Sequence, residues 1–128
     1  MPVFVSDPAN MRELLDSIMA IAKITNRTRE AEALVKNMQD EIQQISSKVE
    51  LVPFDKRPKV FVEIWNDPLT TAGKGSLLDE LVTLAGGKNI AYDTKRAYSI
   101  FSPEQVVSRN PDCIIMSYMD KEQPLKLV

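Results

Sequence analysis

Histidine is missing from this 128-residue chain, and cysteine occurs only once, as Cys113. Many zinc, manganese and copper sites and most Ser-His or Cys-His nucleophile systems depend on imidazole, so the absence of histidine disfavours these chemistries together. One cysteine cannot form an internal disulfide. Because two isoleucines follow Cys113, we expect a small buried apolar residue there rather than a reactive thiol.

The chain also lacks an excess of basic residues, since 16 Lys and Arg stand against 18 Asp and Glu, a formal net charge of −2. Proteins that neutralise a phosphate backbone carry a positive surplus, so nucleic acid is not an expected partner. No apolar run approaches the roughly 20 residues that cross a bilayer, and no basic segment with an apolar signal core opens the chain. A hydrophobic content of 44% is nevertheless typical of one folded domain.

The first half of the chain is predicted to hold a short strand and two helices. Residues 2–5 form an apolar run that stops at a turn, which is typical of a strand end. A helix should begin after Asn10, which forms a capping pair with Glu13, and should end near Thr25. A longer helix is predicted over residues 28–50, with one apolar stripe made of Ala31, Leu34, Val35, Met38, Ile42, Ile45 and Val49.

The second half changes to an alternation of strands and helices. Residues 59–65 are nearly continuously apolar and β-branched, as expected for a strand covered on both faces in a parallel sheet. A turn-rich loop over 66–75 follows. Ser76 then caps a helix, and Gly86-Gly87 supplies a left-handed stop. This pattern predicts a β-loop-α unit.

A second unit of the same kind follows an irregular segment at 89–100. Ser102 is the predicted cap of a short helix that ends near Arg109, with a proline at its first position. Residues 112–118 then have the composition of another buried strand. The fold class predicted for the whole chain is therefore α/β.

The order of these pieces resembles a known family along almost the whole chain. It resembles the periplasmic binding proteins for iron-siderophores, heme and cobalamin, known as class III. In that family two α/β lobes are joined by one long helix, and the ligand lies in the cleft between them. The segments that carry the resemblance are VFVSDP at 3–8, VFVEIW at 60–65, GKGS at 73–76, LAGGKNIA at 84–91, SPEQVV at 102–107 and PDCII at 111–115.

The resemblance implies a domain organisation. Residues 1–27 would be the end of an N-terminal lobe, 28–50 the bridging helix, and 59–128 a partial C-terminal lobe with part of a parallel sheet. Family members are roughly twice this length. The expectation is therefore a fragment, natural or engineered, whose full-length parent is periplasmic or membrane-anchored outside the cell. An unfinished sheet also predicts a homo-oligomer, because a second chain can cover its edge.

Trp65 is the first candidate for ligand contact, because loops beyond the carboxyl ends of parallel strands bind ligands in open α/β sheets. Its indole can stack on a flat macrocycle or siderophore ring, although a tryptophan at the rim of the core is an equal alternative. The resemblance implies that the loop after Trp65 lines the ligand cleft and that an aromatic residue near position 98 faces the ligand. The predicted ligand-binding set is Trp65, Asp67, Thr70, Thr71 and Tyr98.

Other residues are weaker candidates for ligand contact or candidates for a different role. Tyr98 can equally be a half-buried tyrosine, and Tyr92 and Tyr118 are less favoured as ligand contacts. Glu104 lies in the first turn of a helix, where the helix dipole alone favours a carboxylate. The resemblance implies that Glu104 docks into an arginine pocket of the ABC permease.

These observations predict a binding protein rather than an enzyme, with no cofactor and no metal site. Its ligand is expected to be a metal chelate or corrinoid, delivered to a membrane permease for import. The alternative is an interaction domain that dimerises through its long helix, and an α/β enzyme comes third. No carboxylate pair stands out as general acid and base.

Overall fold

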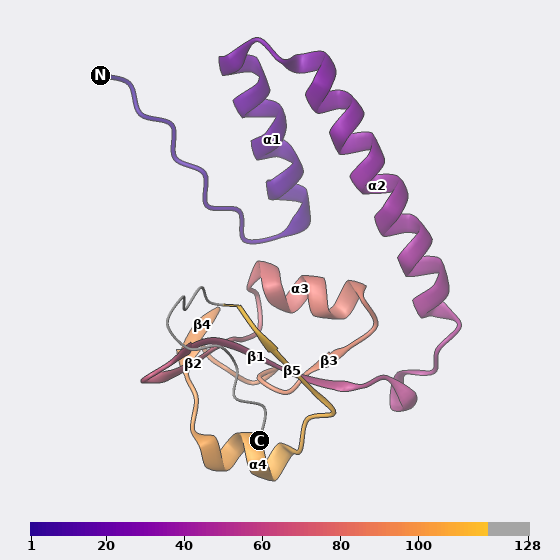
Figure 1. Ribbon diagram of the computed structural model, residues 1–128, viewed down its shortest axis with the longest axis vertical. Coiled ribbons are helices and arrows are strands. Elements are labelled where there is room, and N and C mark those ends of the chain that lie inside the picture. Colours follow the sequence, from indigo (N-terminus) through magenta and orange to yellow (C-terminus); the bar gives the residue numbers. More distant parts are fainter. Residues whose placement is uncertain (118–128) are drawn as a thin grey trace.

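The computed structural model describes residues 1–117, and these form two parts (Figure 1). Residues 1–50 make up a helical arm, in which two consecutive helices pack along each other. Residues 59–117 make up a sheet lobe, in which one mixed sheet carries helices on both faces. The predicted fold class, α/β with a long helix and a partly parallel sheet, is confirmed.

The two helices of the arm begin and end close to their predicted positions. Helix α1 spans Met11–Thr25, and the Oδ1 atom of its cap Asn10 accepts from the N–H of Glu13 at 2.9 Å. Asn26 ends α1 in the left-handed conformation. Helix α2 spans Thr28–Glu50, which at 1.5 Å per residue is a rod of roughly 34 Å.

The predicted strand at residues 2–5 is wrong. Residues 1–8 have no regular secondary structure, and they run beside α1 rather than beside another strand (Figure 1). A strand is stabilised by ladder hydrogen bonds to a neighbour, and within residues 1–117 the five strands of the sheet all lie in the sheet lobe. The segment therefore keeps its apolar side chains exposed, with Val3 at 77% and Val5 at 80%.

The joint between the arm and the sheet lobe is held by side chains. The 3-10 helix η1, Phe54–Lys56, follows α2. Arg57 donates from Nη2 to the carbonyl of Val49 and from Nε to that of Val52, both at 3.2 Å, and so satisfies carbonyls at the end of α2. The Arg57 guanidinium and the Lys88 ammonium each lie within 6 Å of the Phe54 ring centroid.

The central strand of the sheet pairs with three neighbours. It runs parallel to two of them and antiparallel to the third, which is antiparallel to a fourth. The order is β3-β1-β2-β4, and β5 pairs with β1 on its remaining edge. The strands are β1 (Lys59–Asn66), β2 (Leu69–Ala72), β3 (Lys88–Asn89), β4 (Tyr98–Ile100) and β5 (Cys113–Met116).

Two predicted loops contain strands. The loop predicted at 66–75 turns back at Asp67 and Pro68 and returns as β2, and the irregular segment at 89–100 ends in β4. Both strands are short, and neither contains a run of apolar residues long enough to predict a strand next to the turn signals. The sheet is consequently mixed rather than parallel throughout.

A separate apolar cluster lies on each face of the sheet. Helix α3 (Leu77–Leu84) covers a cluster of Val60, Val62, Ala72 and Val82, and helix α4 (Pro103–Arg109) packs Val106 against a cluster of Phe61, Ile90, Ala91 and Phe101. The predicted caps are confirmed, since Ser76 Oγ accepts from Asp79 N–H and Ser102 forms a full capping box with Gln105. The continuously apolar β1 therefore supplies side chains to both layers.

Strand β5 differs from its prediction. All four of its residues are exposed, including the free Cys113, so the expectation of a buried strand and a buried cysteine is wrong for residues 1–117. The physical reason is that β5 pairs with β1 through one edge, while its other edge has no partner among the described strands. The last residue of that predicted strand, Tyr118, lies outside the described residues.

Candidate functional site

The register of three antiparallel strands brings Trp65 and Tyr98 onto one face of the sheet. Trp65 of β1 lies opposite Thr70 of β2, which lies opposite Ile100 of β4. Directly opposed residues share a face, and so do residues two apart on a strand. Tyr98 is opposite Ala72, a member of the cluster under α3, so all of these side chains lie on the α3 side.

A β-bulge in β1 sets the direction of Trp65. The pairing shifts between Glu63 and Trp65, so one extra residue is inserted there. Val60, Val62 and Ile64 face α3, and strict alternation would send Trp65 to the opposite face. The bulge instead places Trp65 opposite Thr70, at the carboxyl end of β1.

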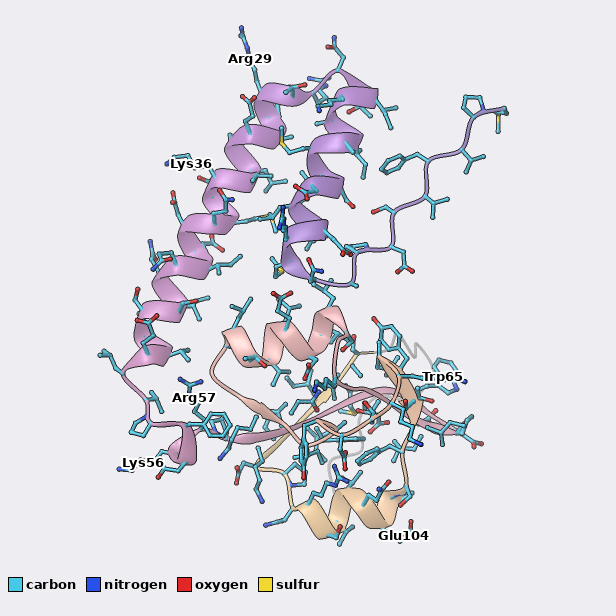
Figure 2. All side chains as sticks on the ribbon, turned by 180° about the vertical axis from the view of Figure 1, so that it is seen from behind. Arg29, Lys36, Lys56, Arg57, Trp65 and Glu104 are labelled. Carbon is cyan, nitrogen blue, oxygen red and sulfur yellow. The ribbon has the colours of Figure 1, made fainter. Side chains whose placement is uncertain are left out.

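This face is open to solvent. Trp65 is 53% exposed, Tyr98 54% and Ile100 72%, so large side chains of β1 and β4, the two strands on either side of β2, are exposed on this face. Trp65 is held in orientation by its Nε1–H, which donates to the carbonyl of Asp67 at 3.0 Å. We refer to Trp65, Thr70, Tyr98 and Ile100 as the aromatic face. Figure 2 shows Trp65 at the end of the sheet lobe away from Lys56 and Arg57.

The polar residues of the predicted set have different positions. Asp67 is exposed in the turn, and Thr70 donates its hydroxyl to the carbonyl of Pro68 at 2.9 Å. Thr71 is completely buried, and its hydroxyl donates to the carbonyl of Val62 at 2.7 Å. Thr71 therefore acts inside the sheet, and its side chain does not reach the aromatic face.

Tyr98 is carried by a segment with several internal contacts. Gly73 N–H donates to the carbonyl of Ala97 at 2.8 Å, directly before Tyr98. The Thr94 side chain lies where a Cβ on Gly73 would be, so only glycine permits this approach. Thr94 Oγ1 also accepts from the N–H of Lys74 at 3.2 Å. The turn before α3 and the segment before β4 thus fix each other.

Glu104 is exposed in the first turn of α4, on the other side of the sheet from α3. Its own backbone N–H and the hydroxyl of Ser102 lower the pKa of its carboxyl. The group is therefore a stable anion at neutral pH. Figure 2 places Glu104 at the same end of the sheet lobe as Trp65.

Sequence reasoning missed two residues of this region. Ile100 joins the aromatic face only through its pairing with Thr70, which no local pattern indicates. Arg109 binds Asp93 through two hydrogen bonds of 2.7 and 2.9 Å, and this partner lowers the pKa of the Asp93 carboxyl. Tyr92, which was a weaker ligand candidate, lies against the same guanidinium, 5.3 Å from it, rather than on the aromatic face.

Residues 1–117 provide neither a metal cluster nor a membrane-spanning helix. They contain no group of three or more histidine, cysteine, aspartate or glutamate side chains placed to hold a metal ion. Within the same residues, neither α2 nor any other helix has the length and apolar character that a bilayer crossing requires.

Comparison with known proteins gives a consistent result. The family model described as periplasmic binding protein matches residues 1–127. The chain is 30% identical over 112 residues to YvrC of Bacillus subtilis, described as an uncharacterized ABC transporter substrate-binding lipoprotein, and the match covers 87% of the chain and 35% of that protein. A vitamin B12-binding protein of Salmonella paratyphi A is 29% identical, with 87% of the chain and 41% of the relative covered.

Solved structures show the same architecture. S. aureus IsdE, determined in complex with heme, superposes with a TM-score of 0.74 at 26% identity, over 91% of the chain and 45% of that protein. The chain thus spans less than half the length of each of these relatives.

Proposed function

The chain belongs to the periplasmic binding protein family, and from that premise we propose that its aromatic face is one wall of the binding site for a flat metal chelate or corrinoid. The protein then acts as the substrate-binding component of an ABC importer, and its task is binding rather than catalysis. The single observation that carries this proposal is the strand register that puts Trp65 and Tyr98, both exposed, on the α3 side of the sheet, with β2 between their strands.

The chemistry of the aromatic face favours a flat, largely apolar ligand. Indole and phenol rings offer large contact areas with defined orientation. Large exposed apolar groups gathered on one face of a sheet are typical of a binding surface rather than of bare solvent contact. The names of the relatives support the same class, since they include a vitamin B12-binding protein and a protein crystallised with heme.

The long helix fits the role of a bridge between two lobes. Helix α2 leaves the sheet lobe at a joint held by Arg57 and by the close contact of Gly86 with Val49, where an added Cβ would be 3.0 Å from a valine methyl. We propose that α2 connects this lobe to a second one that supplies the other wall, and that residues 1–27 belong to that second lobe. Binding to both walls would bury most of the ligand surface, as is usual for small-molecule sites.

The proposal is tested by titrating the chain with hemin, cyanocobalamin and a ferric siderophore while the fluorescence of Trp65, its only tryptophan, is followed. Saturable quenching by one of them is the expected result. Hemin binding is also read from its own absorption band, which permits variants without tryptophan. An absence of saturable binding to all three, in this chain and in a longer protein that carries both walls, would contradict the proposal.

Variants then locate the site. Trp65→Ala and Tyr98→Ala should each weaken binding by about 2- to 13-fold, since an aromatic contact contributes about 0.5–1.5 kcal/mol beyond its buried area. Phe54→Ala is the matched control, because Phe54 is an aromatic residue with 69% exposure near Arg57, at the other end of the sheet lobe. Equal losses in all three variants would indicate nonspecific adsorption to exposed rings.

Glu104 is proposed as a docking residue for the permease. Its exposure, its place at the first turn of α4 and its lowered carboxyl pKa support an ion pair with an arginine of the permease. Because the proposed partner is the permease of an importer, which receives its substrate on the outer side, the binding protein would work outside the cytoplasm, as a periplasmic protein or a lipoprotein. Glu104→Gln should weaken capture by the detergent-solubilised permease without changing ligand affinity, whereas Glu41→Gln on α2 should change neither.

A second candidate function rests on the outer face of α2. Leu34 and Ile45 belong to the predicted apolar stripe, yet they are 49% and 48% exposed. Positions 11 residues apart lie on nearly the same side of a helix. These residues would pair α2 with a second copy, which makes a homo-oligomer. Light scattering that shows a dimer, and a monomer for Leu34→Gln, would favour this interaction role.

A further inference from the structure

Arg109 connects the C-terminal end of α4 to the segment that precedes β4. Its side chain is only 22% exposed. One guanidinium nitrogen donates to the carbonyl of Ile90, and the two terminal nitrogens together bind both carboxylate oxygens of Asp93. This parallel pair of charge-assisted hydrogen bonds fixes the orientation of the guanidinium plane.

The same guanidinium lies against two aromatic rings, one before and one after Tyr98 in the sequence. Its central carbon is 5.3 Å from the ring centroid of Tyr92 and 5.2 Å from that of Phe101. These rings stand at the two ends of a ten-residue segment, and Tyr98 lies inside it. Arg109 therefore joins the two ends of this segment, although Arg109 itself belongs to α4 and not to the segment.

Two further contacts complete the closure. Phe101 is buried at 4% exposure and packs on Phe61 of β1, with ring centroids 5.7 Å apart. Phe101 N–H also donates to the carbonyl of Leu69 at 2.9 Å, which continues the pairing of β4 with β2. The position of β4 beside β2 thus depends on a ring that Arg109 contacts.

We propose that Arg109 is a positioning residue for the aromatic face: by closing the segment from Tyr92 to Phe101, it holds β4 in register with β2 and so sets the place of Tyr98 on the face that also carries Trp65. This inference rests on the proposed function, because it assigns Arg109 a role in ligand affinity without ligand contact. Contacts of Thr94 and Ala97 with the turn before α3 hold the middle of this segment. Arg109 adds the contact that joins its two ends, and every residue of a closed loop is more restricted than in an open one.

The geometry selects arginine over lysine. Asp93 takes two parallel donors, Ile90 takes a donor from the same fork, and both rings are within cation–π distance of one planar cation. A lysine ammonium at this position is a single point donor, and it can satisfy only part of this set. Arg109→Lys should therefore retain part of the effect and Arg109→Ala none.

The first test measures the closure without any ligand. Backbone amides at 92–98 should exchange with solvent at least about tenfold faster in Arg109→Ala than in the parent chain, whereas the amides of β1 keep their rates. Asp93→Asn should act in the same direction with a smaller change. Unchanged exchange at 92–98 would overturn the proposal, and so would a uniform increase that includes β1, since that indicates general destabilisation.

The second test asks whether Arg109 acts through Tyr98. With hemin, cyanocobalamin or a ferric siderophore, whichever binds the unchanged chain, Arg109→Ala should weaken binding by up to the loss that Tyr98→Ala causes, about 2- to 13-fold. In a Tyr98→Ala background the same change should weaken binding by less than about twofold, because the residue being positioned is gone. Equal losses in both backgrounds would overturn the proposal.

The two tests separate this inference from the function on which it rests. If none of the three ligands binds this chain or a longer protein with both walls, the proposed function fails, and with it the role of Arg109 in affinity. The exchange experiment still decides whether Arg109 closes the segment. Restoration of slow exchange in the exchanged pair Arg109→Asp with Asp93→Arg would support a specific contact between these two side chains.

Discussion

The helical arm and the sheet lobe differ in how much of their apolar surface is buried. In the two helices of the arm, which span 11–25 and 28–50, the buried residues are Met11, Ala22 and Ala31. In the sheet lobe, a single strand already buries three consecutive residues, and a cluster lies on each face of the sheet. The difference indicates that the sheet lobe holds the hydrophobic core of the described residues, while the arm depends on it.

The contacts between the two parts are few and partly polar. The N–H of Met11, at the start of α1, donates to Oε2 of Glu80 on α3 at 2.6 Å. Val49, near the end of α2, packs on Gly86, and Arg57 donates to the carbonyl of Val49. The arm is therefore fixed at its base, whereas its far end, where α1 turns into α2, stands away from the sheet lobe (Figure 1).

The largest expected effect tests the core of the sheet lobe. Phe61 is 1% exposed and packs with Ile90, Ala91 and Phe101, so Phe61→Ala should lower the free energy of unfolding by about 3–5 kcal/mol. Urea denaturation followed by circular dichroism measures the loss. The same substitution at Phe54, which is 69% exposed, should cost less than about 1 kcal/mol. Similar losses at both positions would contradict a stability difference between core and surface.

The next effect concerns a buried polar residue of the same lobe. The Asn89 side chain donates to the carbonyl of Ala72 and to Oδ1 of Asp79, both at 2.8 Å, and accepts from the N–H of Ala91 at 3.0 Å. Asn89→Ala leaves these buried partners unsatisfied, so it should cost about 1–3 kcal/mol of unfolding free energy. Asn66→Ala, at the exposed end of β1, is the control and should stay within about 0.5 kcal/mol.

The sequence predicted those parts of the fold whose signals are local. Caps such as Asn10, Ser76 and Ser102 fix helix starts through hydrogen bonds within four residues, and all three hold in the structure. The continuous apolar run of β1 likewise indicated a strand that contributes to two layers. Strands β2 and β4 were missed because each is stabilised by pairing across the sheet. The three or four residues of each strand contain no local pattern that predicts this pairing.

The aromatic face, too, could be predicted from the sequence only in part, because it depends on pairing between strands. Trp65 and Tyr98 were predicted one at a time, and only the register and the bulge at Glu63 show that they share a face with Ile100. Thr71 was predicted as a ligand contact, but alternation along β2 turns it into the sheet. The exposure of Cys113 could not be predicted either, because apolar composition indicates what a residue favours and not whether another element covers it.

The third effect moves to the base of the arm. Asn10→Ala removes the side-chain acceptor of the Glu13 N–H at the start of α1 and should cost about 1 kcal/mol locally. We expect faster hydrogen exchange in α1 with unchanged rates in β1, because the sheet lobe has its own core. Ser102→Ala, which removes the equivalent cap of α4 in the sheet lobe, is the control variant. Faster exchange in both parts after Asn10→Ala would show that the arm and the sheet lobe unfold as one unit.

The smallest effect is expected on the outer face of α2, and it sharpens the comparison most. Leu34→Gln and Ile45→Gln replace half-exposed side chains with another good helix former, so each should change the unfolding free energy by less than about 0.5 kcal/mol. Val35→Gln is the matched control, because Val35 is less exposed than its neighbour Leu34 and should cost more. If Leu34→Gln costs as much as Val35→Gln, and the cost rises with protein concentration, then the outer face of α2 is covered by a second copy in solution. The low burial of the arm's apolar side chains would then apply only to the monomer, because the second copy would cover those side chains.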